Sequence, residues 1–61
     1  MNVYSIRFFR NGKWDKRGVR ATAYTQKEAI AIARERKHIP QDEKVLVSWH
    51  YVHINNNYDF N

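Results

Sequence analysis

The sequence contains no cysteine, a single proline and two glycines among its 61 residues. Without cysteine the chain has no disulfides and no thiolate ligands for zinc, so a small hydrophobic core must hold its one domain together. Two glycines are too few for the phosphate-binding loops of nucleotide-binding enzymes. No apolar run approaches the ~20 residues that cross a membrane, and Arg7 and Arg10 interrupt any possible signal-peptide core. We therefore expect a soluble cytoplasmic protein that makes no membrane contact.

Acidic residues are scarce in the first third of the chain. Residues 1–20 contain six Lys and Arg but only one acid, Asp15, and this segment accounts for the whole formal net charge of +5. In residues 21–61 the five basic and five acidic side chains balance. An excess confined to residues 7–20 acts as a local field that attracts anionic partners, rather than as charge spread for solubility.

Aromatic and β-branched side chains alternate along residues 3–10, a pattern typical of a half-buried strand. Asn11-Gly12 follows, and these two residues most readily adopt the positive φ that a two-residue type I′ turn requires. The sequence therefore predicts a β-hairpin. We call residues 7–20 the basic hairpin.

The expected register pairs three sets of residues across the basic hairpin: Arg10 with Lys13, Phe9 with Trp14 and Arg7 with Lys16. Continued further, this register would set Arg17 opposite Ile6, which faces the core. Either a bulge near Gly18 shifts the phase, or residues 11–17 form a longer loop and only Val19 to Tyr24 pair. We favour the bulge.

A helix should begin after Thr25. Thr25 and Glu28 form a predicted capping box, in which the Thr25 hydroxyl accepts from the Glu28 amide and the Glu28 carboxylate reaches back to the Thr25 amide. Apolar residues at helical spacing follow, and basic residues crowd the last turn, where they complement the negative end of the helix dipole. Pro40 prevents further propagation. The sequence predicts a helix over residues 26–38.

Residues 44–54 carry apolar side chains on both faces, as expected of a strand that is heavily covered. A right-handed crossover from the helix places this strand beside the first one and antiparallel to it. The predicted fold is α+β, with a ββαβ domain over residues 1–54 and a polar tail at residues 55–61. Its three-stranded antiparallel sheet has the order 2-1-3, and one helix packs on one face. The expected core consists of Tyr4, Ile6, Phe8, Ala29, Ile30, Ala33, Val45, Val47 and Trp49.

The sequence lacks the signatures of catalysis and of metal binding. His50 and His53 lie three residues apart on the predicted strand, and so on opposite faces, which disfavours a shared metal ion. Ser48 and His50 share a face but are roughly 6–7 Å apart by strand rise, too far for a nucleophile and its base. We expect no enzyme activity, no cofactor, no metal and no small-molecule substrate.

The basic hairpin combines cations with flat aromatic rings, as nucleic-acid binding on a sheet or ribbon requires. Three interpretations fit: a DNA-binding surface, a surface for a protein partner with acidic side chains, and a solvated hairpin whose charges protect an edge strand. We expect nucleic acid first, bound by a monomer or weak dimer. The candidate contact residues are Arg7, Phe9, Arg10, Lys13, Trp14, Lys16, Arg17 and Arg20.

Several motifs between residues 4 and 36 resemble the arm-type DNA-binding domain at the N-terminus of tyrosine-recombinase integrases: Tyr4, Arg7-Phe8, Asn11-Gly12-Lys13, Lys16-Arg17-Gly18 and Tyr24-Thr25-Gln26-Lys27-Glu28-Ala29. This resemblance implies a basic antiparallel sheet that enters the major groove of DNA. In that family the third strand precedes the helix, whereas here a strand is expected after it.

The predicted ββαβ order, with Tyr24-Thr25, Glu28-Ala29 and a closing strand at Val45 to Val52, also resembles small phage proteins that inhibit a host enzyme. An example is the gene 2-type inhibitor of bacterial RNA polymerase. This resemblance implies a host-takeover inhibitor that binds a bacterial protein, such as RNA polymerase or a defence nuclease. Both resemblances imply a phage or mobile-element origin and action inside a bacterial host cell.

Overall fold

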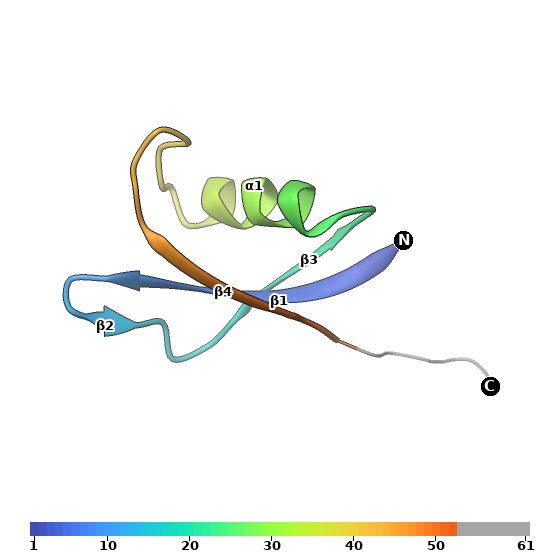
Figure 1. Ribbon diagram of the computed structural model, residues 1–61, viewed down its shortest axis with the longest axis horizontal. Coiled ribbons are helices and arrows are strands. Elements are labelled where there is room, and N and C mark those ends of the chain that lie inside the picture. The colour runs from blue at the N-terminus through green and yellow to red at the C-terminus, as the bar shows by residue number, and fades with distance from the viewer. Residues whose placement is uncertain (53–61) are drawn as a thin grey trace.

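The computed structural model of the chain describes residues 1–52. The predicted tail at residues 55–61, and His53 and Ile54 of the predicted last strand, lie outside the described residues. The elements are β1 (Asn2–Arg10), β2 (Lys13–Trp14), β3 (Val19–Ala23), α1 (Gln26–Arg36) and β4 (Leu46–Tyr51) (Figure 1). The predicted second strand is therefore divided into β2 and β3.

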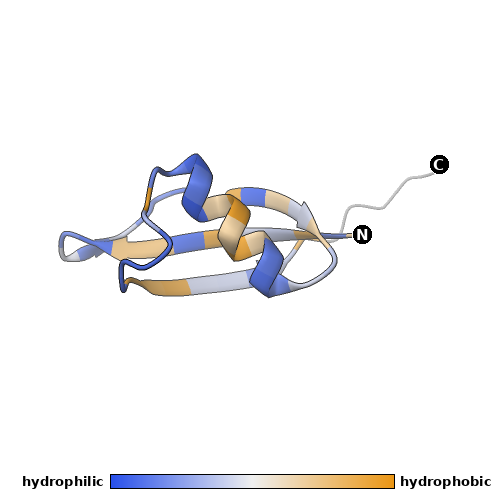
Figure 2. Ribbon diagram, turned by 90° about the horizontal axis from the view of Figure 1, so that it is seen from above, coloured by the Kyte–Doolittle hydropathy of each residue, from blue (hydrophilic) through white to orange (hydrophobic). Residues whose placement is uncertain are grey.

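β1 lies at the centre of one antiparallel sheet. β2 and β3 pair with one side of β1, and β4 pairs with the other side. α1 lies on one face of the sheet (Figure 1) and runs obliquely to the strands when it is seen from above (Figure 2). The predicted α+β class, the helix on one face and the last strand beside the first are confirmed.

The turn of the basic hairpin forms as predicted. Asn11 and Gly12 have φ values of 54° and 78°, the positive values that a type I′ turn requires. The two predicted pairs next to the turn are present, Arg10 with Lys13 and Phe9 with Trp14. The local sequence therefore determines this end of the hairpin.

Nearer the base of the hairpin, the register differs from the simple prediction. Ile6 lies opposite Val19 and not opposite Arg17. Between this pair and the pairs at the turn, β1 has two residues and the facing segment has four. Arg17 therefore leaves the ladder instead of facing the core, and the predicted pair of Arg7 with Lys16 does not form.

The N-terminal end of α1 is capped by the two predicted side chains. Thr25 Oγ1 accepts from the Glu28 amide at 3.3 Å. The Glu28 carboxylate, however, accepts from the Tyr24 amide at 3.1 Å and not from the Thr25 amide. One bond of the capping box forms as predicted, and the bond to the Glu28 carboxylate comes from the residue before the predicted donor.

The C-terminal end of α1 comes two residues earlier than predicted, at Arg36. His38 has a φ of 59°, and the Ile39 amide donates to the Arg34 carbonyl at 2.8 Å. A helix commonly ends in this way, with one residue in the left-handed conformation and an apolar residue after it. Ile39 is buried, so the cap also contributes to the core.

Five of the nine expected core residues are buried: Tyr4, Ile6, Phe8, Ala29 and Ala33. Ile30 and Val45 are only partly buried against them. Ala21, Ala23 and Ile39 complete the core of the described residues. The small alanine side chains allow α1 to lie close to β3, on which it mainly packs.

Val47 and Trp49 were expected in the core, but their side chains are 37% and 40% exposed. Both point to the helix side of the sheet, because residues that lie opposite one another share a face and Trp49 lies opposite Ile6. α1 packs on β3 and β1, and a single helix of 11 residues does not extend over β4. Within residues 1–52, no helix therefore covers this side of β4.

Candidate nucleic-acid interface

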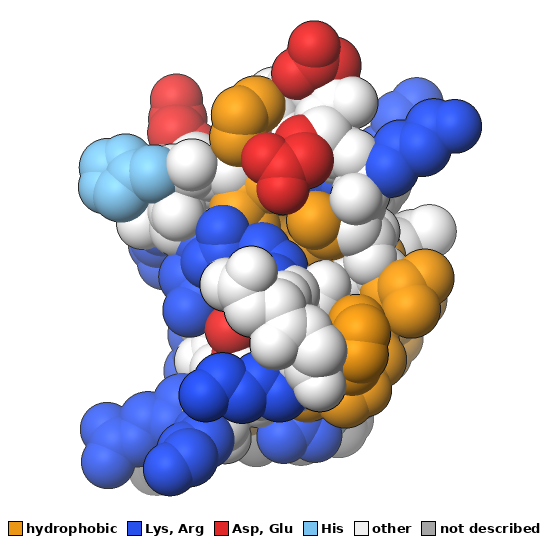
Figure 3. All heavy atoms as spheres, turned by 90° about the vertical axis from the view of Figure 1, so that its left-hand side faces the viewer, with side chains coloured by type: hydrophobic (Ala, Val, Ile, Leu, Met, Phe, Trp, Pro, Cys, Tyr) orange, Lys and Arg blue, Asp and Glu red, His pale blue; other side chains and the backbone are white. Residues whose placement is uncertain are grey.

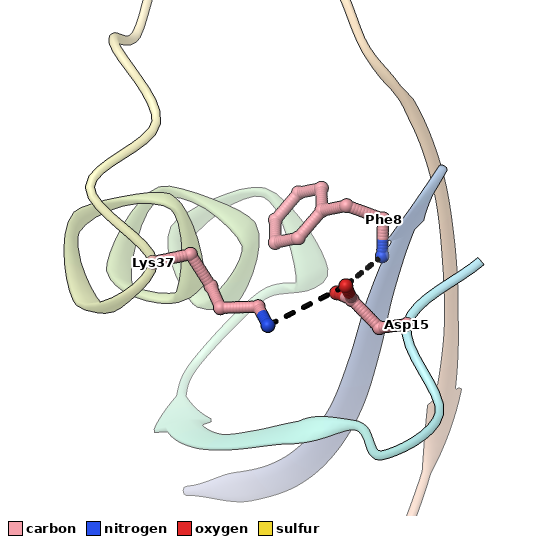
Figure 4. A network of polar contacts seen from close by, with 3 residues as sticks. All are labelled: Phe8, Asp15 and Lys37. Carbon is pink, nitrogen blue, oxygen red and sulfur yellow. Dashed lines mark hydrogen bonds and ion pairs between the residues drawn. The ribbon is translucent and has the colours of Figure 1, made fainter. Parts of the chain in front are cut away.

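The returning half of the basic hairpin leaves the sheet after Asp15 and rejoins it at Val19. Asp15 is shown in Figure 4. The Asp15 amide donates to the Phe8 carbonyl at 3.0 Å, as in a regular ladder. The Phe8 amide, however, donates to Asp15 Oδ2 at 3.1 Å. The carboxylate thus replaces the backbone acceptor, and the chain is free to bend away. The bulge predicted near Gly18 is therefore a departure over residues 15–18 with two extra residues.

Gly18 brings the chain back to β1. A Cβ atom at this position would overlap Ser5 Oγ of β1, so glycine permits an approach that other residues would obstruct. Val19 then resumes the pairing with Ile6. The loop of the basic hairpin is thus fixed by a carboxylate at its start and by a glycine at its end.

The charge of Asp15 is directed away from the cations of the hairpin. Asp15 Oδ1 lies 3.4 Å from Lys37 Nζ at the end of α1, and its side chain is only 16% exposed (Figure 4). Among residues 1–52 this is the only ion pair within 4.0 Å. Within that part of the chain, the six basic side chains of the hairpin segment therefore have no acidic partner, and their field is not neutralised locally.

Four of the eight predicted contact residues lie on the face of the sheet opposite α1: Arg7, Phe9, Trp14 and Arg20. Along β1 the side chains of this face alternate with the buried ones, and the pairings across the sheet extend the face to β2 and β3. No helix among the described residues covers it (Figure 1). We call it the open face. Both of its arginines are exposed.

The other four predicted residues are placed differently. Arg10 and Lys13 lie opposite one another beside the turn, on the other side of the ribbon, and Lys16 and Arg17 lie in the loop between β2 and β3. Figure 3 looks at this end of the molecule, where Lys and Arg side chains gather at the lower left. A shallow hollow there is lined by Arg10, Asn11, Lys13, Trp14, Asp15 and Lys16. Arg10, Lys13 and Lys16 therefore lie around the tip of the hairpin, and the six cations do not share one face.

Phe9 and Trp14 meet across the ribbon on the open face. Their ring centroids are 5.3 Å apart with an interplanar angle of 64°, which is the edge-to-face arrangement that aromatic pairs prefer. Phe9 is half-buried, whereas Trp14 is 43% exposed. The pair thus holds the Trp14 ring in place and leaves much of it accessible for stacking beside the cations.

β4 adds polar residues to the open face that the predicted contact set did not include. Ser48 lies opposite Arg7, and His50 lies opposite Ser5, whose other neighbour is Arg20. Ser48 and His50 share this face, as their spacing along the strand predicts, and both are exposed. Their position beside the two arginines depends on the register between β4 and β1, which the sequence alone does not determine.

The cations at the end of α1 serve the fold. Arg34 Nη1 donates to the Pro40 carbonyl at 2.6 Å, and the Arg36 guanidinium donates to the Arg20 carbonyl of β3. Lys37 is paired with Asp15. These side chains are held by the structure, in contrast to the exposed cations of the hairpin.

Other kinds of site find no support in the part of the chain that the structure describes. No three His, Asp or Glu side chains between residues 1 and 52 gather as ligands for a metal ion. Over the same residues, α1 is far too short and polar to cross a membrane, and there is no other helix. His53, which was weighed with His50 as a metal ligand, lies outside the described residues.

The chain matches no protein-family model, no curated protein and no solved structure.

Proposed function

We propose that this chain is a small non-catalytic protein that binds DNA through the basic hairpin. The observation that carries the proposal is the set of six exposed or half-exposed cations of the basic hairpin that have no acidic partner among residues 1–52, together with the aromatic pair of Phe9 and Trp14 on the same hairpin. Phosphates supply the missing anions, and a ring such as Trp14 provides a stacking surface beside them. The resemblance to integrase arm domains supports DNA and a phage or mobile-element origin.

The shape of the hairpin suits a groove. Phe9 still has Leu46 of β4 as a neighbour, but beyond Phe9 the ribbon consists only of the ends of β1 and β2 joined by a tight turn, and β3 and α1 lie further back (Figure 1). A two-stranded ribbon of this kind fits the major groove of B-form DNA, which is about 12 Å wide. The cations around the tip lie on both sides of the ribbon. In the groove they would therefore lie near the phosphates of both DNA strands.

The alternative partner is an acidic protein surface, as expected for a host-takeover inhibitor. The same unpaired cations favour it, but the two partners respond differently to salt. Release of counterions from DNA makes the logarithm of the affinity fall with the logarithm of the salt concentration, with a slope of roughly −0.9 per neutralised phosphate. A packed protein interface depends on a few anchor side chains and much less on salt.

Fluorescence anisotropy with a labelled DNA duplex tests the proposal directly. If four to six cations contact phosphates, the slope should be about −3.5 to −5.5. A pull-down from bacterial lysate, with and without nuclease, provides the second measurement. Two results together would favour the inhibitor and contradict DNA binding. Protein partners would remain bound after nuclease treatment and in moderate salt, and the DNA affinity would hardly change with salt concentration.

A further inference from the structure

β4 has a free edge. It pairs with β1 on one side, and no strand among residues 1–52 pairs with its other side. The Val52 amide donates to the Val3 carbonyl at 2.8 Å, and bonded pairs alternate along an antiparallel ladder. Counting back from this bond gives the residues whose N–H and C=O groups point to the free edge: Val47, Trp49 and Tyr51.

The side chains of the same three residues are exposed on the helix side of the sheet, by 37%, 40% and 58% in chain order. Buried Tyr4 fixes two of them, because its ring centroid lies 5.6 Å from that of Trp49 and 5.1 Å from that of Tyr51. β4 contains no Lys, Arg, Asp or Glu. An ordered, uncharged and apolar edge of this kind is a template for pairing with another strand.

The opposite edge of the sheet is protected. β3 carries exposed Arg20, and the Arg36 guanidinium donates to the Arg20 carbonyl. A charged side chain discourages a further strand, and the bond from α1 occupies a backbone acceptor. The two edges therefore differ, and only β4 is prepared for pairing.

We propose that β4 pairs with β4 of a second copy of this chain, antiparallel about a two-fold axis that passes through the sheet at Trp49. In this register Trp49 lies opposite Trp49 of the other copy, and Val47 lies opposite Tyr51. All the edge-directed backbone groups of these residues then find partners. Both helices lie on the same side of one continuous sheet, and the exposed apolar side chains of the two copies meet between them.

Charge favours a second copy as the occupant. β4 has no charge with which to select an acidic or a basic peptide, whereas two copies of β4 meet without opposed like charges. Each chain carries a formal charge of +5, but the excess lies on the basic hairpin. Phe9 of that hairpin lies opposite Leu46, at one end of β4. The two-fold axis therefore sends the two hairpins to opposite ends of the sheet. The dimer does not depend on what the hairpins bind.

Sedimentation equilibrium of the full chain, without nucleic acid and in high salt to screen the hairpins, tests the proposal. We expect a reversible monomer–dimer equilibrium. Trp49→Lys sets two cations against each other at the axis, and Tyr51→Lys adds one beside Val47. Each should weaken dimerisation at least about tenfold. At residue 49 two like charges are juxtaposed in the interface, and at residue 51 a charge is buried against an apolar side chain without a partner. Circular dichroism of each variant checks that the fold is retained.

Leu46→Lys is the matched control. Leu46 is 64% exposed, close to the 58% of Tyr51, and lies on the same strand. Its side chain points to the open face, however, and its backbone groups point to β1. This variant should dimerise like the unaltered chain. A chain that remains monomeric, or a dimer that Leu46→Lys weakens as much as Trp49→Lys does, overturns the proposal.

Hydrogen exchange gives a second readout that needs no substitution. The amides of Ser48 and His50 point to β1 and should be protected at every protein concentration. The amides of Val47, Trp49 and Tyr51 should become protected only as the dimer forms. Protection of these three amides in a monomer would overturn the proposal, because it would mean that the same chain covers the edge.

Discussion

The two tryptophans are almost equally exposed, Trp14 by 43% and Trp49 by 40%, but their surroundings differ. Trp14 lies in the basic hairpin between unpaired cations, on the open face. Trp49 lies on an uncharged strand, on the helix side of the sheet, against Tyr4. Exposure alone therefore does not indicate what an aromatic residue contacts. The charges beside the ring and the face that carries it separate a surface suited to phosphates from one suited to another strand.

The surroundings of both tryptophans are built on β1. The largest expected loss of stability comes from replacing Ile6, which packs at the centre of that strand. Ile6 is fully buried between Val19 on one side and Trp49 on the other. Ile6→Ala should cost about 2–5 kcal/mol of folding free energy, a large share of the stability of so small a domain. Urea denaturation measures the loss. Arg7→Ala, at the exposed neighbouring position, should cost less than about 0.5 kcal/mol, and a similar cost for both would contradict the assigned faces.

The next largest effect on stability is expected at Asp15, which fixes the loop of the basic hairpin. Asp15→Ala leaves the Phe8 amide without its acceptor and Lys37 without its partner, and should cost about 1–3 kcal/mol. Asp15→Asn keeps an acceptor oxygen and should cost less. Asp42→Ala, which removes an exposed acid with the same change of charge, is the control. Equal stability of the Asp15→Ala and Asp42→Ala variants would show that the carboxylate does not fix the loop.

The two tryptophans can also be compared in binding. If a base or sugar packs on Trp14, Trp14→Ala should weaken DNA binding by about 1–3 kcal/mol, and Trp14 should account for most of the fluorescence quenching by DNA. Trp49→Phe should leave both the DNA affinity and the quenching unchanged. The affinity is expressed per chain, so that a change in dimerisation through β4 does not alter the comparison. Quenching that disappears with Trp49 and persists without Trp14 would place the ligand on the helix side of the sheet.

Much of the fold could be predicted because its signals are local. Asn11-Gly12 determines the turn and the two pairs beside it. Thr25 and Glu28 determine where the helix begins. The alternation in β1 identifies Tyr4, Ile6 and Phe8 as core residues. In each case the physical cause lies within a few residues of the chain.

The misplaced residues depend on distant parts of the chain. Val47 and Trp49 are apolar and lie on the correct face, but their exposure is set by how far one short helix extends across the sheet. The role of Asp15 depends on Lys37, 22 residues later, and on the bulge. For the candidate site, the sequence identified the charges and the aromatic pair, but not their division between two faces and a loop.

The most direct test compares two double charge reversals that change the net charge equally. Arg7→Glu with Lys16→Glu alters the basic hairpin, and Lys27→Glu with Lys44→Glu alters other exposed positions. Each replacement changes the charge by −2, so both double variants have a formal net charge of +1, starting from +5. Any effect of overall charge is therefore the same in the two proteins.

DNA affinity measured by anisotropy at one fixed salt concentration gives the answer. The hairpin pair should lower the affinity at least about 100-fold and reduce the salt slope by about 2, because two phosphate contacts become repulsive. The Lys27 and Lys44 pair should lower it several-fold at most, with an unchanged slope. Equal losses in the two variants, or a larger loss in the second, would contradict the claim that the basic hairpin is the binding surface.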